Sequence, residues 1–209
     1  MIQCVQGFII TKNKKGVENQ MSIFDNLKNA AGGIAGAVSN IGKETGPKTI
    51  TFERLPESVE EMKALPQGQL KSVYDTAALV VCALCAYAAA PQIGIDMLNF
   101  LKGPQPLSPH EIQFLRDRME GKPYKPFSFF HGATPDNDYT PTQPYTITIE
   151  TNPYTYQNEG YATMHIRSGG ADSLRQVQLR QQGSTGQWFL WENFLLSDIR
   201  EPKSQNPWA

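Results

Sequence analysis

The sequence lacks an excess of charge of either sign. Its 209 residues include 19 Lys and Arg against 20 Asp and Glu, for a formal net charge of −1. Without a positive excess, no global field attracts the chain to nucleic acid or to an anionic membrane surface. Nucleic acid is therefore a disfavoured partner, and any electrostatic recognition has to be local.

Cysteine is scarce, and long hydrophobic runs are missing. Cys4, Cys82 and Cys85 are an odd number of cysteines, which favours a reducing compartment over a disulfide framework. The chain begins with an apolar stretch followed by lysines, the reverse of the order in a secretory signal peptide. The longest apolar run, residues 77–90, is shorter than the roughly 20 residues that a membrane-spanning helix requires. We therefore expect a cytoplasmic protein.

Motifs for metal and redox chemistry are missing too. His110, His131 and His165 are the three histidines, and none has a partner at the spacing that places two metal ligands on one helical face. Cys82 and Cys85 have the spacing of a redox pair or of half a zinc site, but they lie mid-helix among alanines without two further ligands. We interpret both as core cysteines and expect neither a metal site nor a cofactor.

Residues 1–46 are predicted to form an N-terminal extension. Residues 1–20 show no clear period, and Met21 is an alternative start of the chain. From Ser22 onward, apolar residues recur at spacings of three and four, which predicts an amphipathic helix over residues 22–41. Its apolar stripe consists of Phe24, Leu27, Ala31, Ile34, Val38 and Ile41.

This N-terminal helix is rich in glycine and needs a surface to fold on. Gly32, Gly33 and Gly36 each cost about 0.8 to 1 kcal/mol relative to Ala inside a helix. Docking on the rest of the chain or a disordered tail is one interpretation, and self-association or a protein partner is another. Contact with a membrane surface is a minor third alternative, because only Lys28 and Lys43 add positive charge to the polar face.

Start and stop signals predict four helices in residues 47–121, the helical part of a single α+β domain that spans residues 47–209. Ser, Pro and Glu residues suit the first turns, and Pro or Gly residues end the helices. The predicted limits are Ser58 to Pro66, Leu70 to Ala90, Pro91 to Gly103 and Ser108 to Gly121.

Residues 145–209 are predicted to form a C-terminal antiparallel β-meander of about four strands, on which the helices pack. Apolar and polar residues alternate in each segment, and the short connections between the later segments favour antiparallel neighbours. We interpret the connection SGGADS as a hairpin turn rather than an anion-binding nest, because no Lys and helix follow it. The predicted strands lie at residues 145–150, 162–167, 177–179 and 188–191.

The last predicted strand is apolar on both faces. Period two puts Trp188 and Leu190 on one side and Phe189 and Trp191 on the other. We expect the helices to cover one face. The second face needs a cover from the connection over residues 122–144, from the N-terminal helix or from another molecule.

The connection over residues 122–144 carries many prolines and aromatic residues and is too apolar for a free linker. Loops of this length are usually functional or packed by their own side chains. His131 lies near Asp136 and Asp138, so that a carboxylate could orient its imidazole in a hydrolase-like site, with Ser128 or Ser168 as nucleophile. Turn structure is the stronger interpretation, because Asp and Asn ahead of Thr-Pro are common in turns.

The polar face of the meander is a second candidate surface. Charged and aromatic side chains on one sheet bind small ligands or, with more positive charge than is present here, single-stranded nucleic acid. The candidate binding residues of the sheet and its loops are Tyr139, Arg167, Asp172, Arg180, Trp188 and Trp191.

Several strings of the sequence resemble an uncharacterised bacterial family that is known only as a domain of unknown function. They are TFERLPESVEEMKAL, FFHGATPDNDYTP, SGGADS and QWFLWENFLLSDIREP, and the resemblance covers residues 51–209. It implies no activity, cofactor or catalytic residue. We therefore expect an α+β protein that acts as a non-enzymatic interaction or accessory module, with a protein partner or a second copy of the chain as the bound species.

Overall fold

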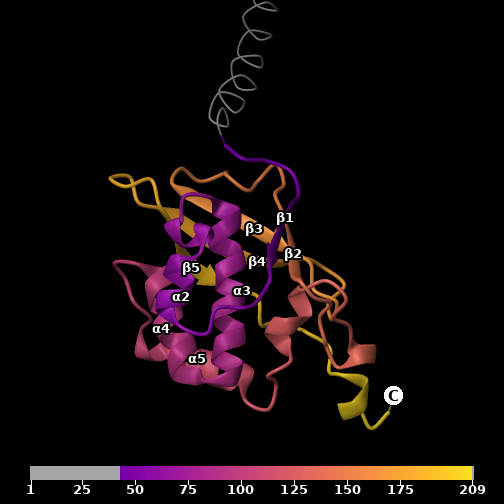
Figure 1. Ribbon diagram of the computed structural model, residues 1–209. Helices are drawn as coiled ribbons and strands as arrows, with labels where there is room; N and C mark the ends of the chain where they lie inside the picture. The colour runs from indigo at the N-terminus through magenta and orange to yellow at the C-terminus, as the bar shows by residue number, and fades with distance from the viewer. Residues whose placement is uncertain (1–42, 209) are drawn as a thin grey trace, which may run out of the picture. The chain divides into compact units, whose positions relative to one another are not determined.

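A computed structural model of the protein describes residues 43–208 (Figure 1). The chain divides into two units, Met1–Lys43 and Glu44–Ala209, and every helix and strand given below belongs to the second unit. The predicted N-terminal helix with Phe24, Leu27, Ile34, Val38 and Ile41 lies outside the described residues. Its surface, partner and possible membrane contact therefore stay predictions.

Four α-helices follow one another as predicted: α2 (Val59–Ala64), α3 (Val73–Ala89), α4 (Pro91–Lys102) and α5 (Pro109–Met119). Helix α3 begins at Val73 rather than at Leu70, because Leu70 has a φ of 56° in the preceding turn and Ser72 is the N-cap. Ser58 and Ser108, the predicted starts of the first and last helices, are N-caps whose side chains accept from the backbone N–H groups of Glu61 and Glu111. Local start signals therefore decide where these helices begin.

The sheet has five antiparallel strands, which lie side by side in the order in which they occur along the chain. The sequence analysis missed the first strand, which precedes the helices and pairs with the second one. Only Ile50 and Phe52 of this short segment point to the core, so its alternation is too brief to be recognised. The strands are β1 (Lys48–Phe52), β2 (Tyr145–Glu150), β3 (Tyr161–Ile166), β4 (Arg175–Gln181) and β5 (Trp188–Asn193).

The helices cover one face of this sheet, here called the inner face. In Figure 1, α3 lies across the strands, with α2, α4 and α5 beside and below it. The inner-face residues Ile147, Met164, Val177 and Leu190 are buried against the helices. Burial of this alternating apolar set is the main stabilising contribution to an α+β fold of this kind.

Helix α3 is buried along almost its whole length. Cys82 and Cys85 are free thiols inside it, and burial raises the pKa of both, as expected for core cysteines. None of the helices in residues 43–208 is both long and apolar enough to cross a membrane.

The long connection between α5 and β2 packs against the edge of β2 and does not cover β5. The backbone N–H of His131 donates to the carbonyl of Thr146 at 2.8 Å. Strands β2 and β3 share two register positions, Ile149 opposite Ile166 and Glu150 opposite His165. The connection thus pairs with the part of β2 that β3 leaves free.

Candidate functional site

The aromatic strand β5 presents two different faces. Trp188 is on the inner face, buried beside the ring of Tyr156 at a centroid distance of 6.4 Å. Its backbone N–H donates to the carbonyl of Leu70 at 2.8 Å, and its carbonyl accepts from the hydroxyl of Thr76 at 3.1 Å. The predicted binding residue Trp188 is therefore part of the core and helps to close the outer edge of the sheet.

Phe189 lies on the opposite, outer face, and the turn after α4 covers it. Gly103 has a φ of 62°, and a side chain at this position would collide with the ring of Phe189. The expected second cover of the aromatic strand is thus supplied by the connection between α4 and α5, and not by the connection over residues 122–144. Glycine is required here both for its positive φ and for the close approach.

A β-bulge sets the position of Trp191. Gln178 of β4 lies opposite Glu192 while Leu179 lies opposite Leu190, so that Trp191 is the extra residue of β5. Bulges redirect side chains and are frequent beside binding sites. The bulge leaves Trp191 on the outer face, next to the side chains of β3 and β4.

Arg180 packs against two aromatic rings on this outer face. Its guanidinium lies 4.8 Å from the ring centroid of Trp191 and 5.5 Å from that of Tyr161, and the two rings meet edge to face at 5.7 Å. Such cation–π contacts contribute about 0.5 to 1 kcal/mol each at exposed sites. Within the part of the chain that the structure describes, the guanidinium forms no hydrogen bond or ion pair, so its N–H donors are held in place without being used.

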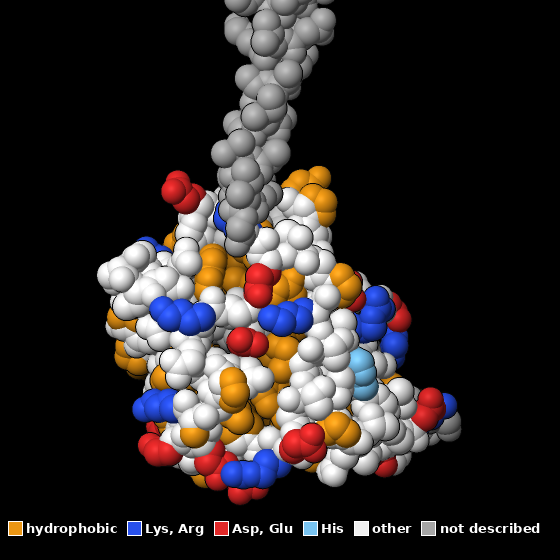
Figure 2. Space-filling model, turned by 45° about the horizontal axis from the view of Figure 1, so that its top comes forward, with side chains coloured by type: hydrophobic (Ala, Val, Ile, Leu, Met, Phe, Trp, Pro, Cys, Tyr) orange, Lys and Arg blue, Asp and Glu red, His pale blue; other side chains and the backbone are white. Residues whose placement is uncertain are grey.

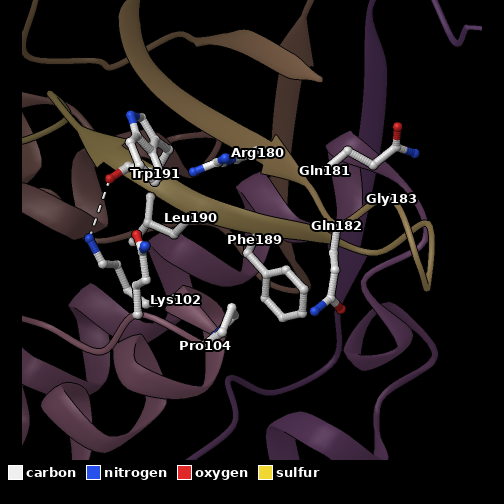
Figure 3. A pocket seen from close by; sticks show the side chains of 10 residues that line it. Lys102, Pro104, Arg180, Gln181, Gln182, Gly183, Phe189, Leu190 and Trp191 are labelled. Atoms are coloured by element: carbon white, nitrogen blue, oxygen red, sulfur yellow. Dashed lines mark hydrogen bonds between the residues drawn. The ribbon is translucent and has the colours of Figure 1, made fainter. Parts of the chain in front are cut away.

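A cavity of about 330 Å³ opens beside this cluster, and we call it the β5 cleft (Figure 3). Three segments line it: Lys102 at the end of α4 with Pro104 and Gln105 after it, residues 180–183 from the end of β4 into the hairpin, and residues 189–191 of β5. Figure 3 shows Phe189 pointing into the middle of the cleft, with Arg180 beside Trp191 above it. Of the described residues, none that lines the cleft is acidic.

The second cation of the cleft, Lys102, is already paired. Its Nζ lies 2.6 Å from a carboxylate oxygen of Glu111 and 3.4 Å from the carbonyl oxygen of Trp191. Burial works to raise the pKa of Glu111, but hydrogen bonds from Lys102 and Ser108 outweigh it and hold that pKa below its usual value. Glu111 therefore stays ionised and neutralises Lys102, which leaves Arg180 as the cation available to a ligand.

The residues of the hydrolase-like hypothesis do not come together. Asp136 forms an ion pair with Lys203, and Asp138 accepts a hydrogen bond from Ser204 at 2.5 Å. His131 instead has its Nε2 2.9 Å from the hydroxyl of Thr148. The turn over residues 134–138 directs both carboxylates to the C-terminal segment, so no His–carboxylate contact of the predicted kind is formed among residues 43–208.

His131 does line a second cleft, of about 400 Å³, at the place where β2 and β3 diverge. Arg167, a predicted binding residue, lies there with its guanidinium 3.8 Å from the carboxylate of Glu150. Both suggested nucleophiles are buried and hydrogen-bonded, since Ser168 donates to Ser128 at 2.8 Å and Ser128 donates to the carbonyl of Lys125 at 2.6 Å. This cleft holds polar groups that are already paired with one another.

The SGGADS turn is committed to packing. The backbone N–H of Gly169 donates to the carbonyl of Ser128 at 2.8 Å, and that of Gly170 to the hydroxyl of Ser168 at 3.1 Å. A side chain at Gly169 would collide with the carbonyl oxygen of Ala133. The hairpin interpretation is therefore correct, and these N–H groups are not available to an anion.

Tyr139 and Asp172, two further predicted binding residues, hold the C-terminal segment. The Tyr139 hydroxyl donates to the carbonyl of Arg200 at 2.7 Å, its ring stacks on Tyr124 at 5.3 Å, and burial raises its pKa to about 12. The carboxylate of Asp172 lies 2.7 Å from the guanidinium of Arg200. Together with Ser128, residues 168–170 and Ile199, these residues form a closed assembly that we call the junction.

The sequence thus pointed to Arg180 and Trp191 but not to Lys102 and Phe189, which also line the cleft, nor to Tyr161, whose ring contacts Arg180 and Trp191 beside it. Lys102 and Tyr161 carry no local signal, because α4 and β3 bring them to β5 from distant parts of the chain. The apolar character of both faces of β5 did indicate that Phe189 needed a cover. No group of three or more His, Cys, Asp or Glu side chains in residues 43–208 is placed to hold a metal ion.

Comparison with known proteins gives a family but no activity. Neither a curated protein nor a solved structure matches the chain. A family model described as "Domain of unknown function (DUF6935)" matches residues 54–203, which is most of the sequence. By this match the chain belongs to the DUF6935 family.

Proposed function

We propose that this protein is a non-enzymatic interaction module that binds an anionic group of a partner in the β5 cleft. The proposal rests mainly on the environment of Arg180. Its guanidinium is held against the rings of Trp191 and Tyr161, while its N–H donors have no partner within residues 43–208. A carboxylate accepts two parallel hydrogen bonds from a guanidinium, which adds geometric selectivity to the charge attraction.

The aromatic side chains of the cleft add an apolar component to this recognition. Phe189 and Trp191 line the cavity and are both half-buried, so a ligand that covers them removes further apolar surface from water. Trp, Tyr and Arg are the residues that most often dominate the energetics of protein interfaces. The favoured partner is therefore a segment of another protein, with a second copy of this chain as the alternative.

The setting of this function is the cytoplasm, which suits an odd number of cysteines and the free thiols of Cys82 and Cys85. Charged side chains of both signs are interspersed on the face shown in Figure 2. That distribution supports recognition by one positioned cation rather than by a broad positive surface.

A matched pair of small probes tests the proposal. N-acetylphenylalanine carries a carboxylate and an aromatic ring, and its primary amide differs only in lacking the charge. We expect the acid to shift the indole N–H resonance of Trp191 in a saturable NMR titration, and the amide to cause little shift. Arg180→Gln should weaken binding of the acid roughly 10- to 100-fold, since a hydrogen bond to a charged group contributes about 1.5 to 3 kcal/mol.

Arg167→Gln is the matched control, because Arg167 is also exposed on the outer face but lies outside the β5 cleft. It should bind the acid as the natural protein does. Equal binding of the acid and the amide, or unchanged binding by Arg180→Gln, would refute the proposed function.

A further inference from the structure

We infer that the partner of the β5 cleft is an extended protein segment in which an acidic residue lies close in sequence to a Leu or Val, whose side chain enters a second, smaller cavity. This inference rests on the proposed function, because the acidic residue is the group that Arg180 binds. It adds a second recognition point and thereby specifies the chemistry of the partner.

The second cavity has a volume of about 70 Å³ and lies between α4, α5 and β5. Its walls are largely aliphatic and aromatic, with Leu98, Leu107, Phe114, Leu115 and Leu190 among them. A cavity of about 150 Å³ lined by such residues accommodates benzene. The smaller volume here therefore fits a branched aliphatic group better than an aromatic ring.

The two cavities are neighbours that share one wall. Lys102, Leu190 and Trp191 line both of them. Figure 3 shows the Lys102 side chain rising to the carbonyl of Trp191, and the same amine lies 2.6 Å from Glu111. Only 10% of the Lys102 side chain is exposed, so its methylene groups form an apolar partition between the cavities while its charge is satisfied by Glu111.

The surface around the smaller cavity is unusually apolar for exposed positions. Phe114 is 39% exposed at its wall, and Phe194 is 50% exposed one residue beyond Asn193, which lines the cavity. Arg118 lies over the Phe114 ring at 5.0 Å and adds positive charge nearby. Exposed aromatic groups beside a cavity are typical of surfaces that bind another protein.

The charges favour one kind of occupant for the whole surface. Arg180 in the larger cavity has no hydrogen-bond or ion-pair partner among residues 43–208, whereas the smaller cavity offers apolar walls and a Lys–Glu pair that is already neutral. An anionic group thus fits the first and an uncharged aliphatic group the second. Because the cavities share a wall, one short extended segment reaches both, with each residue spanning about 3.3 Å.

Four short peptides test this inference: Ac-Asp-Gly-Leu-NH2, whose two side chains lie on the same face of an extended chain, and its variants with Ala or Phe in place of Leu or with Asn in place of Asp, here called Asp-Leu, Asp-Ala, Asp-Phe and Asn-Leu. We expect Asp-Leu to bind at least about tenfold more tightly than Asp-Ala, from burial of the additional carbon atoms. Asp-Leu should also bind more tightly than Asp-Phe, although Phe is the larger apolar side chain. Asn-Leu, which lacks the charge, should bind weakly.

Leu107→Phe, which fills the smaller cavity, should remove the preference for Leu over Ala while leaving the binding of N-acetylphenylalanine unchanged. That second measurement also shows that the variant is folded.

Equal binding of Asp-Leu and Asp-Ala, or preference for Asp-Phe, would overturn the inference and leave the proposed function intact. If the natural protein bound neither the peptides nor N-acetylphenylalanine, the proposed function itself would be refuted. A dimer in sedimentation that dissociates when Phe114 or Phe194 is replaced by Ser would overturn the inference and assign the surface to a second copy.

Discussion

The junction and the β5 cleft differ in whether their polar side chains have hydrogen-bond partners within the chain. In the junction the hydroxyls of Ser128, Ser168 and Tyr139 all form hydrogen bonds within the chain. In the cleft, Arg180 is positioned by two rings and has no hydrogen-bond or ion-pair partner within residues 43–208. Satisfied polar groups hold a fold together, whereas an ordered but unpaired donor is available to a ligand.

The comparison also explains why the most distinctive sequence strings are poor guides to function here. SGGADS and FFHGATPDNDY lie together in the junction, where glycine is needed because Gly169 and Gly170 touch Ala133 and Tyr139. The glycines that make these strings distinctive are therefore explained by close packing, without a role in binding. Lys102 in the cleft and Tyr161, whose ring supports Arg180 beside it, belong to strings that look ordinary.

The largest effect should follow from adding one methyl group to the junction. Gly169→Ala places a side chain against the carbonyl oxygen of Ala133, so we expect the free energy of unfolding to fall by about 3 kcal/mol in urea titrations. Gly183→Ala in the cleft hairpin is the control, because an added methyl group meets nothing within 4 Å there, and it should change stability by less than about 0.5 kcal/mol. Equal stability of the two variants would show that the junction is not tightly packed.

A smaller loss should follow from removing one hydroxyl of the junction. Ser128 is 1% exposed, accepts from Ser168 and donates to Lys125, so Ser128→Ala leaves two buried polar groups without their partner. We expect a loss of about 1 to 3 kcal/mol in urea titrations, with unchanged binding of N-acetylphenylalanine to the folded fraction. Ser184→Ala, at an exposed position of the β4–β5 hairpin, should be neutral. A fully stable Ser128→Ala would mean that the hydroxyl network contributes little.

In the cleft the expected pattern is reversed. Trp191→Leu removes the ring that positions Arg180, yet Trp191 is half-buried and outside the core, so stability should change by about 1 kcal/mol or less. Binding of N-acetylphenylalanine should fall roughly tenfold or more, followed in this variant by the backbone amide resonance of the cleft residue Gly183 because the Trp191 indole is gone. A large loss of stability with unaltered binding would place Trp191 among the structural residues and erase the distinction between the two regions.

Local chemistry made part of this molecule predictable. Ser58 and Ser108 cap their helices because the cap and its partner are three residues apart, a relation that the sequence displays directly. Thr51 of β1 is hydrogen-bonded to Thr146 of β2, which lies 95 residues further along the chain. The sequence around Thr51 contains no signal that predicts this strand pairing. Strand β1 was missed for this reason.

The candidate site was predictable to the same limited extent. Alternation identified Arg180 and indicated that the aromatic strand needs two covers, but the bulge at Trp191 depends on the register between β4 and β5. The cover over Phe189 depends on where the turn at Gly103 lies in space. Both are long-range relations, and so the sequence could indicate that a cover exists without identifying it.

The smallest expected effect concerns His165, which lies on the outer face between Glu150 of β2 and Gln176 of β4. Its Nε2 is 3.2 Å from the amide nitrogen of Asn152 and 3.3 Å from that of Gln176, so it accepts from amide donors, while Nδ1 is buried with no hydrogen-bond partner in the described part of the chain. Burial lowers the pKa of His165 below its usual value, and the charge of Glu150 opposes this only in part.

The sign of the resulting pH dependence follows from this lowered pKa. Below pH of about 6.5 the unfolded chain takes up a proton that the folded chain excludes from His165, so the free energy of unfolding decreases as the pH falls from there toward the folded-state pKa. Urea titrations at pH 7.5 and 5.5 should show a loss of stability that is smaller in His165→Gln than in the natural protein, by at most about 1.4 kcal/mol for each pH unit. If both chains lost the same stability, the buried imidazole would be able to take up its proton in the folded state. The outer face would then gain a further cation in addition to Arg167 and Arg180, and the contrast between the paired polar groups of the junction and the available charge of the cleft would have to include His165.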